Sequence, residues 1–440
     1  MQFYSLTFLY IFLPVSLIVY NLIPKKHKNL AVAVISMLFF ILAQPQYAWL
    51  FAAEILVQYA FSKGMSRFSE DAKKKKTVFT AAIITNMAVM LGFSVMNQIA
   101  GMEMPLGTMV ISFTAIGYFV DVYKGESDYI NSFDDFAVFM GFFGKLYRGP
   151  LVRNEKREDL TGEKTFSIEK TGEGLCLFLR GMAKYVLLAT PIKRVYDSLC
   201  EANVEEISVV GEWASIIALG MMIFYDLSGF CDMARGLGLC FGMSLEKNFY
   251  YPFQSPSVTD FLDRFNMTVT GFFRHYVYDN LHTKEHSALQ FVVDTLLISM
   301  LCGVWFGIRM NYVFWGLYIA FFIIIEGLFL NKVLEKIPSF FARIYTFCVT
   351  MLSMTLFSAS TIGPLDAFKA MFGFGAQIIT DRVYYVISEN VLVLIVGAFF
   401  LSSVFDIITR NIKKKNAFLY NSVCVAESFV FLVLVTAELI

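Results

Sequence analysis

The sequence has few charged residues. Only 16% of its 440 residues are Asp, Glu, Lys or Arg, whereas an average soluble domain carries about 25%. By contrast, 57% of the residues are hydrophobic and 17% are aromatic. This composition excludes an ordinary soluble domain, because such a domain would expose more apolar surface than water tolerates. The formal net charge is zero, so overall charge points to no nucleic acid partner.

Histidine is scarce, and cysteine is not clustered. The seven cysteines are scattered, mostly in apolar runs, and no pair has the close spacing of a zinc site. They are interpreted as packing residues, because buried cysteine behaves as a small hydrophobe. Of the four histidines, His282 and His286 have the i, i+4 spacing that can present two ligands on one helical face. No carboxylate-rich motif accompanies them, so no metal site is predicted.

Long apolar runs are the main feature that is present. A membrane-spanning helix needs about 20 largely apolar residues, and about ten to twelve segments qualify, several of them short enough to be broken or re-entrant. The first run lacks a basic leading segment and a small-residue cleavage site, so it is interpreted as a retained helix rather than a signal peptide. The runs are Ser5–Ile23, Leu30–Ala43, Tyr47–Phe61, Thr77–Met96, Leu106–Val122, Gly174–Pro191, Trp213–Tyr225, Ala288–Trp305, Tyr312–Leu330, Arg343–Phe357, Val391–Phe405 and Ala417–Val435.

Lysine is unevenly distributed among the loops between these runs. Lysine clusters follow the first and third runs and precede the last, at Lys25–Lys28, Lys73–Lys76 and Lys413–Lys415. The loop Asn97–Met104 has no basic residue, and the loop Asp197–Glu212 is acidic. Because cytoplasmic loops carry the excess of Lys and Arg, we expect the lysine clusters in the cytoplasm and the N-terminus outside, in a plasma (cytoplasmic) membrane.

Two stretches, Tyr123–Gly172 and Gly229–Thr283, break the pattern of apolar runs. Their charged residues are interleaved with glycine and aromatic residues. Irregular backbone at membrane depth must be buried in protein or line a wet cavity, so any chemistry is expected here. The predicted organisation is one transmembrane domain, with N-terminal helices in 1–123, a core with re-entrant segments in 124–330, and C-terminal helices in 331–440.

Several motifs follow one another along the chain. Phe224–Gly238 and Phe241–Phe253 are the longest, and Ser257–Phe261 and Arg274–Tyr278 continue them. Shorter motifs are Phe8–Pro14, Pro105–Gly107, Tyr118–Gly125, Phe133–Phe136, Arg148–Arg153, Leu356–Ser358 and Ala367–Gly373. In sequence and in order, these motifs resemble those of the membrane-bound O-acyltransferase (MBOAT) family, in its alginate O-acetylation branch.

The resemblance implies an all-α, polytopic integral membrane protein, an MBOAT-type ring of about 10–12 transmembrane helices with re-entrant segments around a central tunnel. It also implies acyl transfer from a cytoplasmic donor, an acyl-CoA or acyl-carrier thioester, to an extracellular polymer or lipid. Members of this branch acetylate exported polysaccharides, and relatives help to D-alanylate teichoic acids. The expected partners are membrane lipid, the acyl donor, the exported polymer and an extracellular acyltransferase- or esterase-like protein. No bound cofactor is expected.

The resemblance also locates the family's active site, where this sequence departs from the pattern. The family uses a histidine in a Gly-aliphatic-Trp-His-Gly element, and often a second His or Asn on a preceding segment. Here Gly303–Gly307 has Phe306 at the histidine position, and Leu262–Asn266 has Asn266 at the second position. Histidine suits a general base, because its unperturbed pKa of about 6.5 lies near working pH. Phenylalanine cannot take a proton, so ordinary histidine-based transfer is not expected.

Other polar residues are candidates for a replacement base. A desolvated carboxylate can act as a base if its pKa rises, and Asp263, beside Asn266, is the main candidate. Asp226 and Asp232 stand at family positions, where they are candidates for the tunnel or for internal hydrogen bonds and ion pairs. His275 lies nine residues after Asn266, on the opposite face if both share one helix.

Arginines form a second group of candidates. Arginine inside a membrane protein usually finds an anionic partner. Arg148, Arg235 and Arg309 therefore line the tunnel and bind an anionic ligand, pair with a local Asp or Glu, or reach an interface. Arg264 and Trp305 are further substrate or tunnel candidates, because they lie in the two active-site elements. Glu326, inside an apolar run, is expected to face protein or a cavity and to have a structural role.

Three functions remain open from the sequence. The chain is an O-acyltransferase with a nonstandard or substrate-supplied base, a catalytically inactive paralogue that serves as a scaffold, or a conduit for an anionic small molecule or lipid. A neighbouring gene for an extracellular esterase-like partner would favour the first. A histidine-bearing paralogue in the same operon would favour the second.

Overall fold

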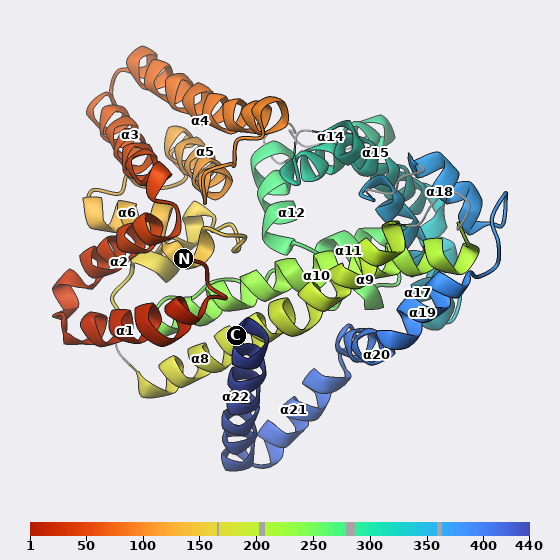
Figure 1. The fold of residues 1–440 in the computed structure, drawn as a ribbon. Helices are drawn as coiled ribbons and strands as arrows, with labels where there is room; N and C mark the ends of the chain where they lie inside the picture. Colours follow the sequence, from red (N-terminus) through yellow and green to blue (C-terminus); the bar gives the residue numbers. More distant parts are fainter. Residues whose placement is uncertain (165–166, 202–206, 279–286, 308, 359–362) are drawn as a thin grey trace. The chain divides into compact units, whose positions relative to one another are not determined.

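All regular elements of the described chain are helical (Figure 1). The computed structural model describes residues 1–164, 167–201, 207–278, 287–307, 309–358 and 363–440. Within these ranges β pairing is limited to two isolated bridges, Ser208–Gln377 and Phe249–Phe265. The all-α prediction is confirmed. The predicted histidine pair, His282 and His286, lies outside the described residues, as does part of the acidic loop.

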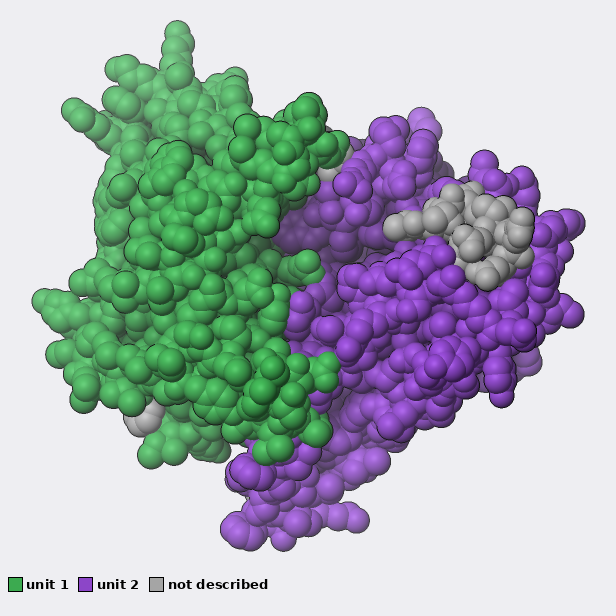
Figure 2. All heavy atoms as spheres, viewed as in Figure 1, with its two compact units in different colours: residues 1–182, 230–247, 431–440 green, residues 183–229, 248–430 purple. Residues whose placement is uncertain are grey.

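The chain forms two compact units, coloured separately in Figure 2. Unit 1 comprises residues 1–182, 230–247 and 431–440, and unit 2 comprises residues 183–229 and 248–430. The long helix α10 contributes residues to both. The predicted ring, central tunnel and single domain stay predictions.

Unit 1 has an aromatic core near the N-terminus. The buried rings of Phe3, Phe39 and Phe143 pack with centroids 5.1 and 5.2 Å apart. Its helices, some of them short 3₁₀ or π turns (η), are η1 (Phe8–Phe12), α1 (Leu13–Leu22), η2 (Lys25–His27), α2 (Lys28–Ala43), η3 (Pro45–Tyr47), α3 (Ala48–Arg67), α4 (Ala72–Ala100), α5 (Thr108–Lys124), α6 (Phe133–Gly141), η4 (Phe143–Lys145), η5 (Asn154–Lys156), α7 (Glu158–Thr161) and nearly all of α8 (Ile168–Ala183).

Unit 2 contains both predicted active-site elements. Its helices are η6 (Lys184–Ala189), α9 (Thr190–Cys200), the first part of α10 (Val209–Cys240), η8 (Pro252–Gln254), α11 (Val258–Arg264), α12 (Met267–Phe273), η9 (Arg274–Tyr278), α14 (Ala288–Trp305), α15 (Met310–Ile325), η10 (Glu326–Leu330), α16 (Asn331–Leu334), α17 (Ser339–Ser353), η11 (Met354–Leu356), α18 (Gly363–Met371), α19 (Asp381–Glu389), α20 (Val391–Phe400), α21 (Val404–Lys415) and most of α22 (Ala417–Leu439).

The helices confirm a multi-pass membrane protein. In the described residues, eight are long and apolar enough to span a membrane, or nine if the bent pair α19 and α20 is one span. This is fewer than the ten to twelve expected, because α3 carries Glu54, Gln58 and Lys63 among its apolar residues and α5 has only 17 residues. The eight are Lys25–Ala43, Ala72–Ala100, Ile168–Cys200, Val209–Cys240, Ala288–Trp305, Met310–Leu334, Ser339–Leu356 and Phe418–Leu439.

The two interrupted stretches contain short elements, with one exception. Between Tyr123 and Gly172 the structure has the nine-residue helix α6, the four-residue α7 and short 3₁₀ turns. In the second stretch, α11 and α12 have seven residues each. The exception is the start of that stretch, because α10 continues without a break to Cys240. The irregular backbone that was predicted for this stretch therefore begins only after Cys240, where the helices α11 and α12 are short.

Candidate functional site

Phe306 lies at the C-terminal end of α14, in unit 2. Ser287 caps the start of this helix by accepting the backbone N–H of Gln290 at 3.2 Å. The helix ends at Trp305, and Phe306 forms its C-cap. Gly307 follows with a φ of +146°, a conformation that side chains disfavour. Helices α14 and α15 pack against each other, so the predicted active-site position 306 lies where α14 ends.

Two glycines bring these two helices into close contact. A Cβ atom on Gly303 would lie 2.1 Å from the carbonyl oxygen of Tyr312, and one on Gly316 would lie 2.4 Å from that of Ser299. Both distances are far below van der Waals contact, so only glycine fits. Small residues of this kind let membrane helices approach each other. They fix where Phe306 stands relative to the first turns of α15.

Phe306 lines a small apolar cavity of about 20 Å³. Its ring lies 5.3 Å from that of Phe357 and 5.8 Å from that of Trp315, both edge-on. The Trp315 indole N–H is already bonded to Ser353 Oγ at 3.1 Å. Among the described residues, the lining consists of Gly220, Ile223, Phe253, Phe261, Phe265, Phe306, Trp315, Met351, Met354 and Phe357.

In the part of the chain that the structure describes, this lining carries no side chain that can take a proton from a hydroxyl. The volume is close to the minimum for one water molecule, but a buried water also needs two to four polar partners. The lining does not offer them, so the cavity favours apolar atoms. The predicted histidine position is therefore surrounded by aromatic rings and methionines rather than by a polar catalytic site.

Asn266 takes part in a buried hydrogen-bond network. It precedes α12 with a φ of +56°, which asparagine tolerates better than most residues. Its Oδ1 accepts the side-chain amide of Asn248 at 2.8 Å. Asn248 Oδ1 in turn accepts the backbone N–H of Thr268 at 2.8 Å. Phe265, the residue before Asn266, lines the cavity with Phe306.

The acids close to Asn266 in the sequence have basic partners. Asp263 pairs with Arg274 at 2.9 Å, and the two side chains are 43% and 55% exposed. Asp260 pairs with Arg264 at 2.9 Å. Exposed ion pairs of this kind contribute little to stability. Asp263 would therefore have to leave Arg274 before it could take a proton from a hydroxyl.

The remaining candidates of unit 2 show no common site. Asp226 lies in the middle of α10 and is partly buried. Trp305 is the last residue of α14 and is also partly buried. Arg309 is exposed and forms the N-cap of α15, where its carbonyl oxygen accepts the N–H of Tyr312 at 3.1 Å.

In unit 1, Arg235 has the local partners that one alternative predicted. Its guanidinium lies 3.3 Å from Asp232 and its Nε donates to the Leu245 carbonyl at 3.3 Å. Arg148 is exposed, and its guanidinium lies over the Phe230 ring, 5.7 Å from the centroid. Lining of a tunnel by Arg148, Asp232 or Arg235 stays a prediction.

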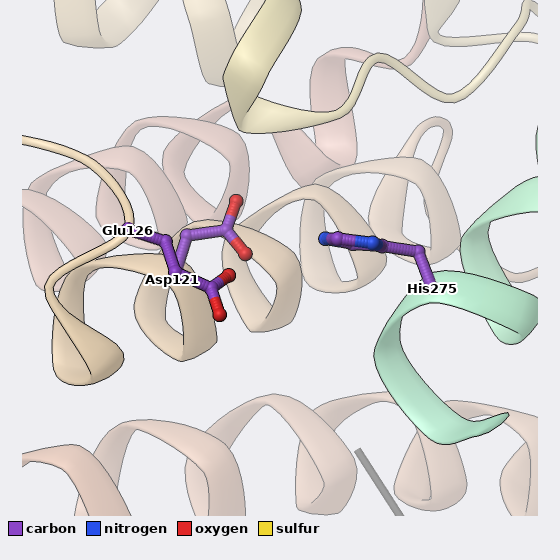
Figure 3. Close-up of side chains that lie close together, drawn as sticks. All are labelled: Asp121, Glu126 and His275. Atoms are coloured by element: carbon purple, nitrogen blue, oxygen red, sulfur yellow. The ribbon is translucent and has the colours of Figure 1, made fainter. Parts of the chain in front are cut away.

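Two carboxylates of unit 1 lie at the end of α5. Figure 3 shows Asp121 on the last turns of the helix and Glu126 on the segment that follows. The N–H of Glu126 donates to the Asp121 carbonyl at 2.9 Å. His275, drawn in the same figure, extends from η9 of unit 2. Neither unit contains all three donors among its described residues, so no metal site is built from them.

Sequence reasoning missed two features of the site. One is Asn248, whose role depends on a contact that no sequence motif marks. The other is the specific partner of Glu326, a fully buried residue. Its carboxylate accepts the backbone N–H of Val258 at 2.7 Å, the N–H of Thr259 at 2.9 Å and the Thr259 hydroxyl at 2.7 Å. Glu326 thus anchors the start of α11.

Comparisons with known proteins give a consistent result. Residues 126–362 match the model of the membrane-bound O-acyltransferase family (MBOAT). The chain is 26% identical over 394 residues to the probable alginate O-acetylase AlgI of Pseudomonas aeruginosa, covering 85% of this chain and 75% of that protein. It is 25% identical over 251 residues to a peptidoglycan O-acetyltransferase of Helicobacter pylori, covering 56% and 47%. It is 29% identical over 140 residues to a teichoic acid D-alanyltransferase of Bacillus subtilis, covering 30% and 35%.

Proposed function

Because the chain belongs to the membrane-bound O-acyltransferase family, we propose that it takes part in the acylation of an exported cell-envelope polymer. The observation that carries this proposal is the family match over 126–362. The names of its relatives support it, since they specify alginate, peptidoglycan and teichoic acid as the acylated polymers. The acyl group is acetyl or D-alanyl by the same reasoning.

The proposed reaction moves an acyl group from a cytoplasmic thioester, an acyl-CoA or an acyl-carrier protein, to a polymer hydroxyl. The thioester C–S bond breaks, an ester C–O bond forms, and the hydroxyl proton ends on the released thiol. The protein would lie in the plasma membrane with its N-terminus outside, as the lysine clusters indicate. An extracellular acyltransferase- or esterase-like protein would complete the transfer to the polymer.

The proposed reaction needs a general base that takes the proton of the polymer hydroxyl. A positioned general base typically contributes 10²–10⁴-fold to such a transfer. Phe306 cannot supply it, and the cavity around Phe306 contains no alternative. Asn266 can orient or polarise a carbonyl, but an amide takes no proton at neutral pH. The base in an active protein is therefore Asp263, released from Arg274 when substrate binds, or a group of the substrate itself.

A second candidate function is favoured by the apolar cavity at Phe306. In this alternative the chain keeps the family scaffold and binds a partner of the same pathway, while another protein performs the transfer. The observation behind it is the aromatic and methionine lining around Phe306, because such side chains pack and take no proton. A conduit for an anionic molecule has less support, since Arg235 has an acidic partner in its own unit.

One experiment separates these functions. Ester-linked acyl groups are released from the envelope polymer of a deletion strain by mild base and quantified, after complementation with wild type, Asp263→Asn, Asn266→Ala or Phe306→Leu. An acyltransferase predicts that wild type restores the ester, and an acyltransferase with Asp263 as its base also predicts that Asp263→Asn lowers it at least tenfold. Phe306→Leu is the matched control, because it exchanges one apolar side chain for another and should retain the ester.

The alternative outcomes are equally specific. If the empty deletion strain carries as much ester as the wild type, the proposed acylation is wrong. If wild type and all three variants restore the ester equally, Asp263 is not the base, and purified wild type then separates a substrate-supplied base, which gives turnover, from a scaffold, which gives none. Turnover of the purified chain at about 1 s⁻¹ or above, with loss on Asn266→Ala, would show a rebuilt active site around Asn266.

A further inference from the structure

Helix α21 of unit 2 has an exposed apolar face and a basic end. No residue of Val404–Lys415 is buried. Val404, Ile407 and Ile408 are 44%, 52% and 49% exposed, and at 100° per residue they fall on one side of the helix. The last turn carries three exposed lysines, Lys413–Lys415. Such a helix has the composition of one that lies in a membrane interface.

The position of α21 in the chain agrees with this location. It is separated by only Asn416 from α22, whose segment Phe418–Leu439 is long and apolar enough to span a membrane. The lysines thus lie within five residues of a predicted span, at the level where lipid headgroups begin. Figure 1 shows α21 and α22 meeting at a sharp turn. A juxtamembrane lysine cluster of this kind attracts anionic headgroups.

The polar face of α21 contacts the chain on the other side. The Asp406 carboxylate accepts a hydrogen bond from the Tyr251 hydroxyl, and Arg410 interacts with the hydroxyl of Tyr250. Arg410 also lies 3.6 Å from Asp406, one turn away on the same face. Lys413 falls within 20° of Asp406 on a helical projection. Lys413 and the tyrosine contacts therefore share one face of α21, and Lys414 and Lys415 follow in the same last turn.

Tyr251 is held in a backbone conformation that few residues adopt. Its φ is +48° and its ψ is +57°, the left-handed region that a bulky side chain rarely enters without other contacts to hold it. Burial and the neighbouring Asp406 raise the pKa of Tyr251, so its hydroxyl keeps the proton that it donates. The contact with α21 is one of the interactions that hold this strained residue.

The segment that contains Tyr251 leads directly to the candidate site. Its four residues 248–251 make successive contacts with the loop between α11 and α12 and with α21. The backbone N–H of Tyr250 donates to the Arg264 carbonyl at 2.9 Å. Phe249 forms the isolated antiparallel bridge with Phe265, which lines the cavity of Phe306. Asn248 binds Asn266.

We propose that α21 binds anionic phospholipid headgroups through Lys413–Lys415, and that Asp406 and Tyr251 connect the bound helix to the loop that carries Asn266. Asp406 and Tyr251 are positioning residues in this arrangement. Bound lipid fixes α21 in the interface, and the fixed helix holds the strained Tyr251 turn and, through it, residues 264–268. The proposal concerns lipid binding and loop order, so it does not depend on acyl transfer.

Lipid binding is tested on the full-length chain by native mass spectrometry with phosphatidylglycerol or phosphatidylcholine. We expect wild type to retain phosphatidylglycerol preferentially. The triple variant Lys413→Gln, Lys414→Gln, Lys415→Gln should lose most of this preference, on the order of 100-fold for three headgroup contacts. The matched control is Lys73→Gln, Lys74→Gln, Lys76→Gln, which removes three exposed lysines from α4 of unit 1. This control should leave the hydrogen–deuterium exchange of residues 248–268 unchanged in either lipid.

Coupling is tested by hydrogen–deuterium exchange in nanodiscs of each lipid. We expect phosphatidylglycerol to slow exchange at least threefold in residues 248–268 of wild type. The α21 lysine variant, Tyr251→Phe and Asp406→Asn should each remove this lipid dependence, while the α4 control keeps it. Tyr251→Phe must still bind phosphatidylglycerol, because its lysines are intact. Equal retention of both lipids overturns the binding site. Slowed exchange that survives in Tyr251→Phe and Asp406→Asn overturns the connection.

Discussion

At the residue scale, the surroundings of Phe306 decide what a histidine there can do. We predict that Phe306→His changes the acyl-transfer rate by less than tenfold. An imidazole at this position would meet the rings of Trp315 and Phe357, and neither orients a ring nitrogen toward a hydroxyl. An oriented base would give 10²–10⁴-fold. The measurement is ester formation by purified wild type and variant with a thioester donor.

The same substitution should lower stability. Burying a ring N–H without a partner costs about 1–3 kcal/mol, so the unfolding midpoint of Phe306→His in detergent should fall below that of the Phe306→Leu control. A rate increase of 100-fold or more, with no loss of stability, would show that a histidine in this cavity can act as a base, and would contradict the prediction drawn from the apolar lining.

Glu326 is the residue for which burial predicts the largest effect. We predict that Glu326→Leu destabilises the protein by about 2–5 kcal/mol, since it leaves the N–H groups of Val258 and Thr259 buried without an acceptor. Thr259→Val removes only the hydroxyl bond and should cost about 1 kcal/mol. Thermal unfolding of both variants in one detergent checks the difference. Equal midpoints would mean that water or another group replaces the carboxylate.

These residues also show which features of the site could be predicted from the sequence. Position 306 was predicted as the active-site position from the Gly303–Gly307 pattern, because the pattern is local and contiguous. A polar role for Glu326 was predicted from a single charge in an apolar run. Its partners on α11 lie 67 and 68 residues away, and no local rule relates such positions. The apolar lining of the cavity comes from α10, α11, α15 and α17 together and was not predictable for the same reason.

At the element scale, the α14–α15 pair depends on two glycines. We predict that Gly303→Ala destabilises the protein by about 1–3 kcal/mol, the usual effect of overpacking, because the new Cβ would lie 2.1 Å from the Tyr312 carbonyl. The matched control is Gly92→Ala in α4, where a Cβ meets nothing within 4 Å. This control should be neutral or gain up to about 1 kcal/mol from helix propensity. Unfolding midpoints of the two variants are compared, and equal values would contradict the close helix contact.

The elements themselves were predicted unevenly. Apolar runs predicted most of the helices, because a membrane span needs length and apolar composition and both can be read from the sequence. Their ends were less predictable. Helix α10 continues to Cys240 through Asp226, Asp232 and Arg235, residues that seemed to interrupt it. Asp232 and Arg235 are spaced i, i+3 and pair with each other, so the helix continues through a charge pair that composition alone marks as a break.

At the scale of the whole molecule, orientation in the membrane follows from helix length and lysine distribution. Helix α4 has 29 residues, about 44 Å at 1.5 Å per residue, which exceeds the roughly 30 Å of a hydrocarbon core. Asp71 caps its start by accepting the N–H of Lys74 at 3.1 Å, and Gly101 ends it with a φ of +62°. We therefore expect the lysine cluster and the Glu103 loop to lie on opposite sides of the membrane.

We predict that the Lys73–Lys76 and Lys413–Lys415 clusters both face the cytoplasm. Single cysteines replace Lys74, Lys414 or Glu103 in a chain whose seven native cysteines are changed to serine or alanine. An impermeant maleimide should label Glu103→Cys in intact cells, and should label Lys74→Cys and Lys414→Cys only after the membrane is opened. The reason is the excess of Lys and Arg in cytoplasmic loops. Labelling of Lys74→Cys or Lys414→Cys in intact cells would invert the assignment of that loop, and with it the direction of the proposed acyl transfer.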